Sequence, residues 1–458
     1  MLIDPAGQAL LAAGDHARAV RHFSSLAALD PNAPAASLGL ALALAATGRF
    51  SEAEVAIAHA RNLAPTSIDL LAAQANLYEQ MGDQAKALQG YLDLLTRDPN
   101  HLPAAHNLGS LLYRLGYFAE AAQQHRETVR RHPQSFATWR DLGQALVAGG
   151  QLDAGIDALA KACQLAPNER DNRFAHGLAL LCAGRWAEGW PLYEARWQPG
   201  EAPPGLPGVP TWQGEALTGK HLVVFAEQGY GDTLMFCRYL PLLAGLTAAL
   251  SVVVPAPLVK LLRASFPDLA IDSRPTAGAA AHYSITLGSL PLRFLALGQA
   301  TPPRPGRYLQ PSPTARAAAA ALLPEDATGL GLTWRGQPRY ASNRGRSLDL
   351  PALLARSPQP EGRHYAFQPD ISAAEQALLA QRGDTDLAPH LPDFDHSAAL
   401  LERLGGLLTV DTAMAHLAGG LALPCHIAHR REGEWRWGTD GRGSAWYEKC
   451  WLLENCDR

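Results

Sequence analysis

Apolar and small residues recur at a fixed step in the first two-fifths of the chain. Amphipathic stretches rich in alanine and leucine each end near a proline, and these prolines lie 34 residues apart: Pro31, Pro65, Pro99, Pro133 and Pro167. Glycines follow the same step: Gly14, Gly48, Gly82, Gly116, Gly150 and Gly184. Because the columns share one register, composition alone does not account for them. Each period predicts a helix, a turn at the glycine and a second helix that ends near the proline.

A period of 34 residues is typical of tetratricopeptide repeats. Large apolar residues at the same step would fill the space between neighbouring helices: Phe23, Ile57, Tyr91, Leu159 and Tyr193. One repeat cannot bury its apolar face alone, so stacking predicts a superhelix whose concave surface suits ligands or partner chains. We expect an α-solenoid of about six repeats over residues 1–197, in which the last repeat lacks the closing proline and acts as a cap or junction.

The pattern changes after residues 198–210, a proline- and glycine-rich stretch that we interpret as a linker. Short β-branched apolar runs at 221–226 and 250–255 then alternate with helical patterns, which predicts βαβ units and a parallel sheet. After a second proline-rich stretch the alternation resumes at 329–334, 364–368, 406–410 and 423–429. The fold class is therefore an α-solenoid followed by α/β lobes at 211–310 and 311–458, with a ligand cleft between their strand ends.

Composition narrows the function classes only a little. The 458 residues are 47% hydrophobic and carry a net charge of -4, which gives no reason to expect nucleic acid as a partner. Six cysteines without a CxxC pair argue against a zinc module or a disulfide framework. The chain starts without a basic segment and contains no long uninterrupted apolar run, so we expect no membrane span and a cytoplasmic location. An oligomer remains open.

The first candidate site is the stretch AEQGYGDT at 226–233. It follows an expected strand and precedes an expected helix, so Gly229 and Gly231 shape a tight turn and Asp232 lies at the carboxyl end of the strand. A catalytic carboxylate there would face the cleft. The alternative is that Asp232 only caps the helix. The string GYGDTL lacks the third glycine of the dinucleotide-binding fingerprint.

The second candidate site is TVDTAMAHLAGG at 409–420, again between a strand and a helix. Asp411 and Thr412 lie where the helix begins, so the backbone N–H groups of Thr412 and Ala413 are candidate phosphate ligands. His416 follows one turn later. The alternatives are that Asp411 is a helix cap and that His416 is a packed or solvent-facing histidine.

Two further clusters carry charge or aromatic groups. The loop 335–347 holds four arginines, whose guanidinium groups match phosphate oxygens unless the loop is only a solvated surface: Arg335, Arg339, Arg344 and Arg346. Near the C-terminus an aromatic group is either a ligand clamp or a structural anchor between the lobes. Its members are Trp435, Arg436, Trp437, Trp446 and Tyr447.

These motifs carry a specific resemblance. The stretches HLVVFAEQGYGDTLMFCRYLPLLA, GLTWRGQP, NRGRSLDL, DTAMAHLAGG and EWRWG resemble the C-terminal domain of bacterial tetratricopeptide proteins related to glycosyltransferase family 9, the heptosyltransferase group. The resemblance implies a GT-B fold of two Rossmann-like lobes, with the donor nucleotide held chiefly by the second lobe and the acceptor approaching from the first. It also implies inverting transfer from a nucleotide sugar without a metal or other cofactor.

Residue by residue, the resemblance makes Asp232 the candidate general base and Asp411, Thr412, Ala413 and His416 the candidate diphosphate site. Arg346 would stabilise the leaving group. The other candidate donor and phosphate ligands are Gly229, Gly231, Arg335 and Ser347. Candidate donor or lobe contacts are Gln228, Trp334, Trp435, Arg436 and Trp437.

Two functions remain open from the sequence. The first is a glycosyltransferase whose repeats present a protein or other polymeric acceptor. The second is a non-catalytic scaffold whose degenerate α/β half binds partners or senses a sugar nucleotide. Asp232, Thr412 and His416 favour the first. Tyr340 and Asn343 favour the second, because related repeat proteins carry histidine and aspartate there.

Overall fold

The computed structural model describes most of the chain, and its residues pack as two compact units, Met1–Asn172 and Arg173–Arg458. The described residues are 3–197, 203–275, 281–299, 301–303, 306–325, 327–336, 347–428, 434–437 and 444–453. The loop residues Arg339, Tyr340, Asn343, Arg344 and Arg346 lie outside them. The sequence period ends the repeats at 197, whereas the packing assigns the chain from Arg173 onward to the second unit.

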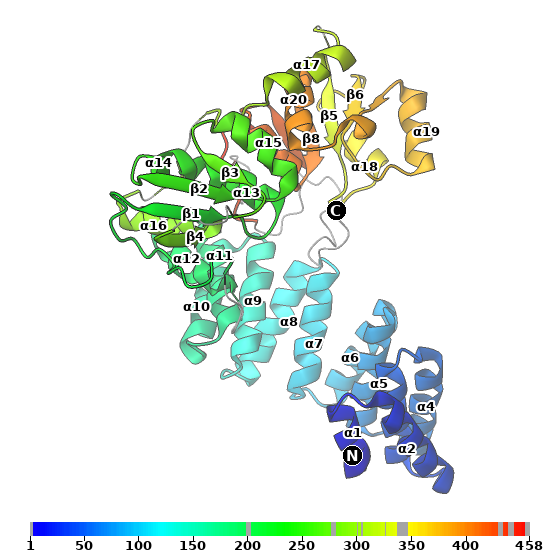
Figure 1. The fold of residues 1–458 in the computed structure, drawn as a ribbon. Helices are drawn as coiled ribbons and strands as arrows, with labels where there is room; N and C mark the ends of the chain where they lie inside the picture. Colours follow the sequence, from blue (N-terminus) through cyan, green and yellow to red (C-terminus); the bar gives the residue numbers. More distant parts are fainter. Residues whose placement is uncertain are drawn as a thin grey trace. The chain divides into compact units, whose positions relative to one another are not determined.

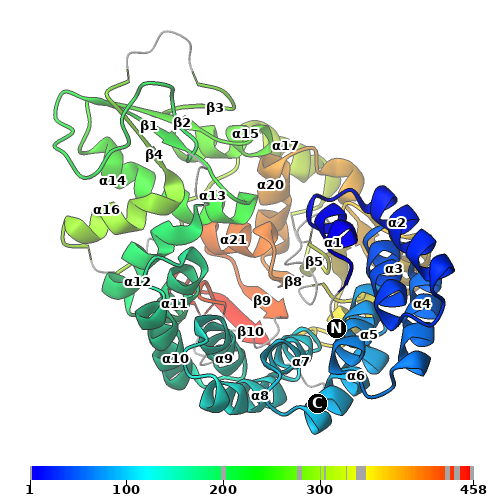
Figure 2. The ribbon, with the colours of Figure 1, turned by 90° about the horizontal axis from the view of Figure 1, so that it is seen from below.

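The first unit consists of helices in antiparallel pairs (Figure 1). They are α1 (Pro5–Ala12), α2 (His16–Leu29), α3 (Pro34–Ala46), α4 (Phe50–Leu63), α5 (Ile68–Met81), α6 (Gln84–Arg97), α7 (Leu102–Arg114), α8 (Phe118–Arg131), α9 (Phe136–Ala148) and α10 (Leu152–Leu165). Figure 2 shows α5, α7 and α9 along the inner side of the stack, with α6, α8 and α10 outside them. The expected helical repeat solenoid is confirmed.

The sequence columns explain this geometry. Gly82 ends α5 with a φ of 78°, a left-handed conformation that glycine adopts without a steric penalty, and its equivalents at the same step also have positive φ. Within the helices, a Cβ added to Gly143 would lie 2.5 Å from Leu159 Cγ, so only glycine permits this approach. The buried apolar residues form separate clusters along the stack rather than one core.

The second unit opens with helical residues of the last repeat. Helix α11 (Arg170–Cys182) spans the boundary, and α12 (Trp186–Tyr193) and the 3-10 turn η1 (Glu194–Arg196) follow. Trp190 and Tyr193 belong to the same apolar core as Phe236 and Trp446 of the α/β part. The last repeat is therefore built into the core of the α/β unit.

The first sheet of this unit is parallel, with the strand order β3-β2-β1-β4. Its strands are β1 (His221–Phe225), β2 (Ala249–Val253), β3 (Ala270–Asp272) and β4 (Tyr283–Thr286). The helical segments are α13 (Tyr230–Phe236), η2 (Cys237–Tyr239), α14 (Leu240–Ala244), α15 (Ala256–Ser265), η3 (Leu287–Ser289) and α16 (Leu290–Ala296).

The second sheet is also parallel, with the order β10-β9-β8-β5-β6-β7. Its strands are β5 (Leu330–Thr333), β6 (His364–Ala366), β7 (Thr385–Asp386), β8 (Leu407–Val410), β9 (Cys425–Ala428) and β10 (Cys450–Leu453). The helical segments are α17 (Pro313–Leu322), α18 (Leu350–Leu354), α19 (Ala373–Arg382), η5 (Ala388–His390), α20 (Phe394–Leu404) and α21 (Ala413–Gly420). The predicted α/β region with parallel sheets is confirmed.

One helix from each sheet brings the candidate motifs together. The loop after β1 leads into α13, the loop after β8 leads into α21, and the two helices pack on each other. The contact is close, because a Cβ added to Gly231 of α13 would lie 2.6 Å from Cδ2 of His416 on α21. Among the helices that the structure describes, none has the length and apolar character needed to cross a membrane.

Candidate functional site

Asp232 lies in the first turn of α13, where the sequence places it. Its Oδ2 accepts a hydrogen bond from the backbone N–H of Gly229, the residue that caps the helix, at 3.4 Å. Its Oδ1 accepts two bonds from the guanidinium of Arg436, from Nη2 at 2.5 Å and from Nε at 3.1 Å. The capping role and the charged contact therefore coexist on one carboxylate.

The ion pair sets the charge of this carboxylate. Burial opposes ionisation, but the Arg436 charge and its hydrogen bonds outweigh burial and hold the pKa of Asp232 below its usual value. The two side chains are only 14% and 15% exposed, so water screens the pair weakly. Glu434 also accepts a hydrogen bond from Arg436, which places one guanidinium between two carboxylates.

His416 lies inside the same cluster and is 3% exposed. Its Nδ1 is 2.8 Å from the hydroxyl of Tyr447, and its ring centroid lies 4.7 Å from that of Trp437. Burial, with the Arg436 charge beside it, lowers the pKa of His416 to about 3. The imidazole is therefore neutral at physiological pH, and packing rather than charge determines its place.

The start of α21 is built as a capped helix. Thr412 is the N-cap, and its Oγ1 accepts from the N–H of Met414 at 3.3 Å, while Ala413 is the first helical residue. Asp411 accepts a hydrogen bond from Nε1 of Trp437 at 2.9 Å. The carboxyl end of β8, the N-terminus of α21 and the indole of Trp437 thus form one polar corner beside the Asp232–Arg436 pair.

The C-terminal aromatic residues divide into two groups. Trp435 and Trp446 pack edge-on against Trp190 of α12, with ring centroids 5.6 and 6.1 Å away, and they also contact Phe236. These two indoles are buried and anchor the C-terminal segment to the last repeat. Trp437, in contrast, covers His416 and bonds Asp411, so it belongs to the candidate site.

The residues after β5 form a separate cluster. The Trp334 indole donates to Oε1 of Glu375 at 2.7 Å, and Arg335 also donates to Glu375 and to the backbone carbonyl of Asp370. The hydrogen bonds to Glu375 outweigh the effect of its burial and lower its pKa to about 2. Ser347 Oγ accepts from the N–H of Gly336. The predicted phosphate ligand Arg346 lies outside the described residues.

Sequence reasoning missed an ion pair of Glu227, the second residue of the stretch 226–233 that contains Asp232. Glu227 is buried and accepts from Nη2 and Nε of Arg196 at 2.9 and 3.1 Å. The next residue, Gln228, has a φ of 59° and accepts a hydrogen bond from Tyr193. The only signal in the sequence is that a glutamate directly follows an apolar run. A charge buried at that place needs a cation as its partner.

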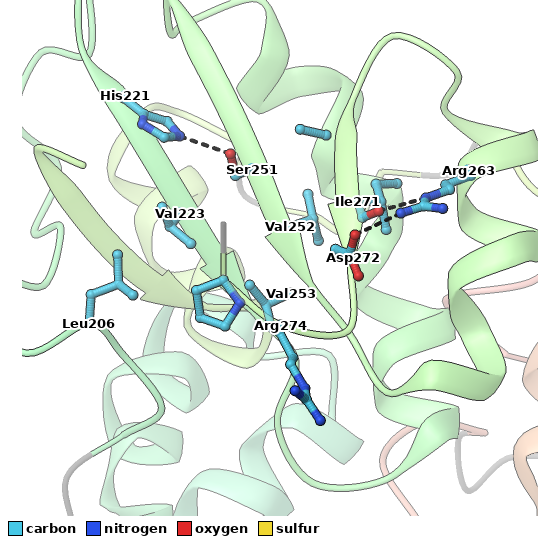
Figure 3. A pocket seen from close by; sticks show the side chains of 12 residues that line it. Leu206, His221, Val223, Ser251, Val252, Val253, Arg263, Ile271, Asp272 and Arg274 are labelled. Atoms are coloured by element: carbon cyan, nitrogen blue, oxygen red, sulfur yellow. Dashed lines mark hydrogen bonds and ion pairs between the residues drawn. The ribbon is translucent and has the colours of Figure 1, made fainter. Parts of the chain in front are cut away.

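The cavity drawn in Figure 3 lies away from these residues. It measures about 160 Å³ and lies over strands β1 to β3, where His221 bonds Ser251 and Arg263 pairs with Asp272. None of the predicted site residues lines it. Within the described parts of the chain, no three histidine, cysteine or acidic side chains are arranged to hold a metal ion.

The fold and the site define a class of protein: a helical repeat solenoid continued by a parallel α/β unit with a charged corner between two helix starts. Models of the tetratricopeptide repeat match residues 10–77, 73–101 and 106–170. The N-terminal part of the chain is therefore a tetratricopeptide-repeat solenoid, a scaffold for protein interaction.

Two curated proteins resemble the chain over different lengths. Protein FlbA of Caulobacter vibrioides is 25% identical over 96% of this chain and 79% of its own length. Tetratricopeptide repeat protein 7A of Homo sapiens is 35% identical, but the match covers 25% of this chain and 14% of that protein. The first similarity thus extends through the α/β unit, whereas the second covers a quarter of the chain.

Two solved structures each resemble less than half of the chain. The Cut9–Hcn1 hetero-tetramer of the APC/C matches 42% of this chain and 38% of that one, with 20% identity and a TM-score of 0.36. YrrB, described as a tetratricopeptide protein with an unusual peptide-binding site, matches 37% of this chain and 87% of that one, with 18% identity and a TM-score of 0.32.

Proposed function

We propose that this protein is a glycosyltransferase that transfers a sugar from a nucleotide-sugar donor to a protein or other polymeric acceptor held by the repeats. The α/β unit would then be a GT-B-like pair of lobes of the family 9 type. The observation that carries the proposal is the meeting of α13 and α21, which brings Asp232 and the capped start of α21 to one corner through the contact of Gly231 with His416.

The carboxylate of Asp232 suits a general base. As the acceptor hydroxyl oxygen bonds to the anomeric carbon, Asp232 takes the hydroxyl proton, and the bond from that carbon to the diphosphate oxygen breaks with inversion. The Arg436 charge keeps Asp232 ionised and therefore able to accept a proton at neutral pH. The same charge lowers its basicity, so the acid limb of the transfer rate would lie below the usual aspartate range.

The leaving diphosphate needs positive groups once its bond breaks. The start of α21 offers backbone N–H groups and the positive end of a helix dipole at Thr412 and Ala413. His416 is neutral there and would act by supporting α13 through Gly231 rather than as a cation. Arg436 already bonds Asp232 and Glu434, so a phosphate that bound it would share its guanidinium with these carboxylates.

A second candidate function has its own supporting observation. Asp232 and Arg436 are largely buried and satisfy each other, Arg335 bonds Glu375, and Trp437 covers His416. A site closed in this way fits a non-catalytic scaffold that keeps the fold of a transferase and uses its repeats to bind a partner. The two candidates differ in one property, which is turnover that depends on Asp232.

The test is a transfer and donor-hydrolysis assay with a panel of nucleotide sugars on the full chain. Asp232→Asn keeps the size of the side chain and removes its ability to accept the proton, so we expect kcat to fall by about 100-fold or more with a small change in donor KM. Asp268→Asn changes an exposed aspartate of the same lobe and serves as the matched control.

Each result assigns one function. Turnover that Asp268→Asn retains and Asp232→Asn loses supports the transferase. Donor binding by both variants and wild type without any Asp232-dependent turnover overturns it and supports the scaffold.

A further inference from the structure

The end of the last repeat is tied to the strand that leads to Asp232. Arg196 closes the 3-10 turn after α12, and its side chain is 3% exposed. It donates two hydrogen bonds, of 2.9 and 3.1 Å, to Glu227, which lies two residues after the end of β1. The chain positions are 31 residues apart, so the pair joins the repeat segment to the first α/β sheet.

The same guanidinium also reaches the end of β4. Its Nη2 donates to Oγ of Ser289 at 2.7 Å and to Oγ1 of Thr286 at 3.3 Å. Glu194 accepts from Arg196 at 2.6 Å and from Ser289 at 3.0 Å. One arginine therefore holds the carboxyl ends of two neighbouring strands, and removing it would leave buried acceptors and a buried carboxylate without their cation.

The loop between this pair and Asp232 holds a conformation that it would not adopt alone. Gln228 has a φ of 59°, a left-handed value that non-glycine residues rarely adopt and that persists only where surrounding contacts fix it. Tyr193 of α12 donates to its side-chain oxygen at 3.3 Å. On the other side, a Cβ added to Gly288 would lie 2.0 Å from Oε1 of Glu227, so the carboxylate rests directly on that backbone.

We propose that Arg196 and Tyr193 are positioning residues, through which the last repeat holds the Glu227–Gln228 turn and so sets the place of Asp232. This inference rests on the proposed function, since it assigns the repeats a role in the transfer step besides holding the acceptor. Asp232 is four residues beyond Gln228, and the N–H that it accepts belongs to Gly229, the next residue of the turn. A shift of the turn would therefore move both the carboxylate and its hydrogen-bond donor.

The first measurement does not depend on catalysis. In Arg196→Met of the full chain, we expect backbone amides of 226–232 to exchange with solvent about tenfold faster, while amides of β8 keep their wild-type rates. Arg185→Met is the matched control, because Arg185 pairs with Glu188 on the exposed face of α12. Unchanged exchange at 226–232 in Arg196→Met would overturn the inference.

The second measurement is transfer kinetics on the same variants. We expect kcat of Arg196→Met to fall by about 10- to 100-fold with donor KM within about threefold, because a small displacement of a catalytic group affects the transition state more than binding. Arg196→Lys, which keeps the charge, should recover part of kcat. Faster exchange with an unchanged kcat would contradict the positioning role.

Two further results are distinguished: a variant that does not fold, and a wild type that transfers no sugar. If Arg196→Met does not fold, Arg196→Met with Glu227→Gln removes both charges and should fold, and the same exchange and kinetic criteria then apply to it. If wild type transfers no sugar, the proposed function fails, whereas faster exchange at 226–232 still supports the hold of the last repeat on the turn.

Discussion

Two buried histidines, one in each compact unit, differ in their hydrogen-bond partners. His125 of α8 and His416 of α21 each pack against a glycine of a neighbouring helix, since a Cβ on Gly109 or Gly231 would be 2.4 or 2.6 Å from the ring. His416 bonds Tyr447 and stacks near Trp437. Neither ring nitrogen of His125 has a hydrogen-bond partner among the described residues.

The difference follows from how each unit is assembled. A repeat packs only against its neighbours, so a polar side chain between two helices can form hydrogen bonds only with groups of those adjacent helices. His125 occupies the column of Phe23, Ile57, Tyr91 and Leu159 and fills it as a spacer. The α/β unit brings distant segments together, so that Asp232 and Arg436 pair across 204 residues. The partnered Asp232–Arg436 pair lies at the corner where we place the chemistry.

Arg436→Met should produce the largest effect, because it removes the cation from a buried carboxylate. We expect the α/β unit to lose about 3–5 kcal/mol of unfolding free energy at pH 7. Without Arg436, burial raises the pKa of Asp232, so the variant regains stability as acid protonates it, and its deficit relative to wild type shrinks toward pH 4.

Urea titrations followed by tryptophan fluorescence measure this change. Of the ten tryptophans, only Trp139 precedes Arg173, so the signal reports chiefly on the α/β unit. Arg263→Met is the control, since its ion pair with Asp272 is more than half exposed and should contribute less than about 1 kcal/mol. Equal effects of the two variants would mean that the Asp232 pair is no more than a surface contact.

The sequence predicts the repeats well because their period directly reflects contacts between neighbouring helices. Gly109 and Gly143, for example, recur at the 34-residue step because two helices approach closely there. It also predicts that Asp232 and Thr412 lie at helix starts, because the change from apolar strand to helix is local. It could not predict the partner of Asp232, since nothing near Arg436 specifies a residue 204 positions earlier.

Arg335 illustrates a second limit of sequence reasoning. Its loop is rich in arginine, which favours phosphate binding, but the structure places its guanidinium on Glu375, the third helical residue of α19, which shares a capping box with Ser372. The sequence shows the capping pattern of Ser372 and Glu375, but it does not show that Glu375 lies next to Arg335 in space. The Arg196–Glu227 pair escapes notice for the same reason, because each charge looks ordinary until the fold buries it.

His125→Leu should give the next largest effect, with the opposite sign. Burial lowers the pKa of His125 to about 4, whereas the unfolded chain titrates near its usual 6.5. Between these values the unfolded state binds a proton that the folded state does not. The free energy of unfolding of wild type therefore falls by up to about 3 kcal/mol as pH falls from 6.5 to 4. Leucine, which occupies the equivalent position at Leu159, should abolish that loss and raise the free energy of unfolding by about 1 kcal/mol at pH 7.

Circular dichroism during urea unfolding follows the helical repeats and tests this prediction. His59→Leu changes an exposed histidine of α4 and is the control. If His125→Leu kept the wild-type dependence on pH, then His125 would not be the group whose protonation the folded repeats resist.

The two glycine contacts give the smallest and most direct comparison. Gly109→Ala and Gly231→Ala each push a methyl group into an imidazole, and overpacking of this kind costs about 1–2 kcal/mol. His125 has no hydrogen bond to lose, so its ring can shift, and Gly109→Ala should be rescued almost fully when His125 is also replaced by alanine. His416 cannot shift without losing Tyr447, so Gly231→Ala combined with His416→Ala should leave part of the cost unrecovered. Equal rescue in the two double-mutant cycles would show that partners make no difference to how firmly these histidines are held.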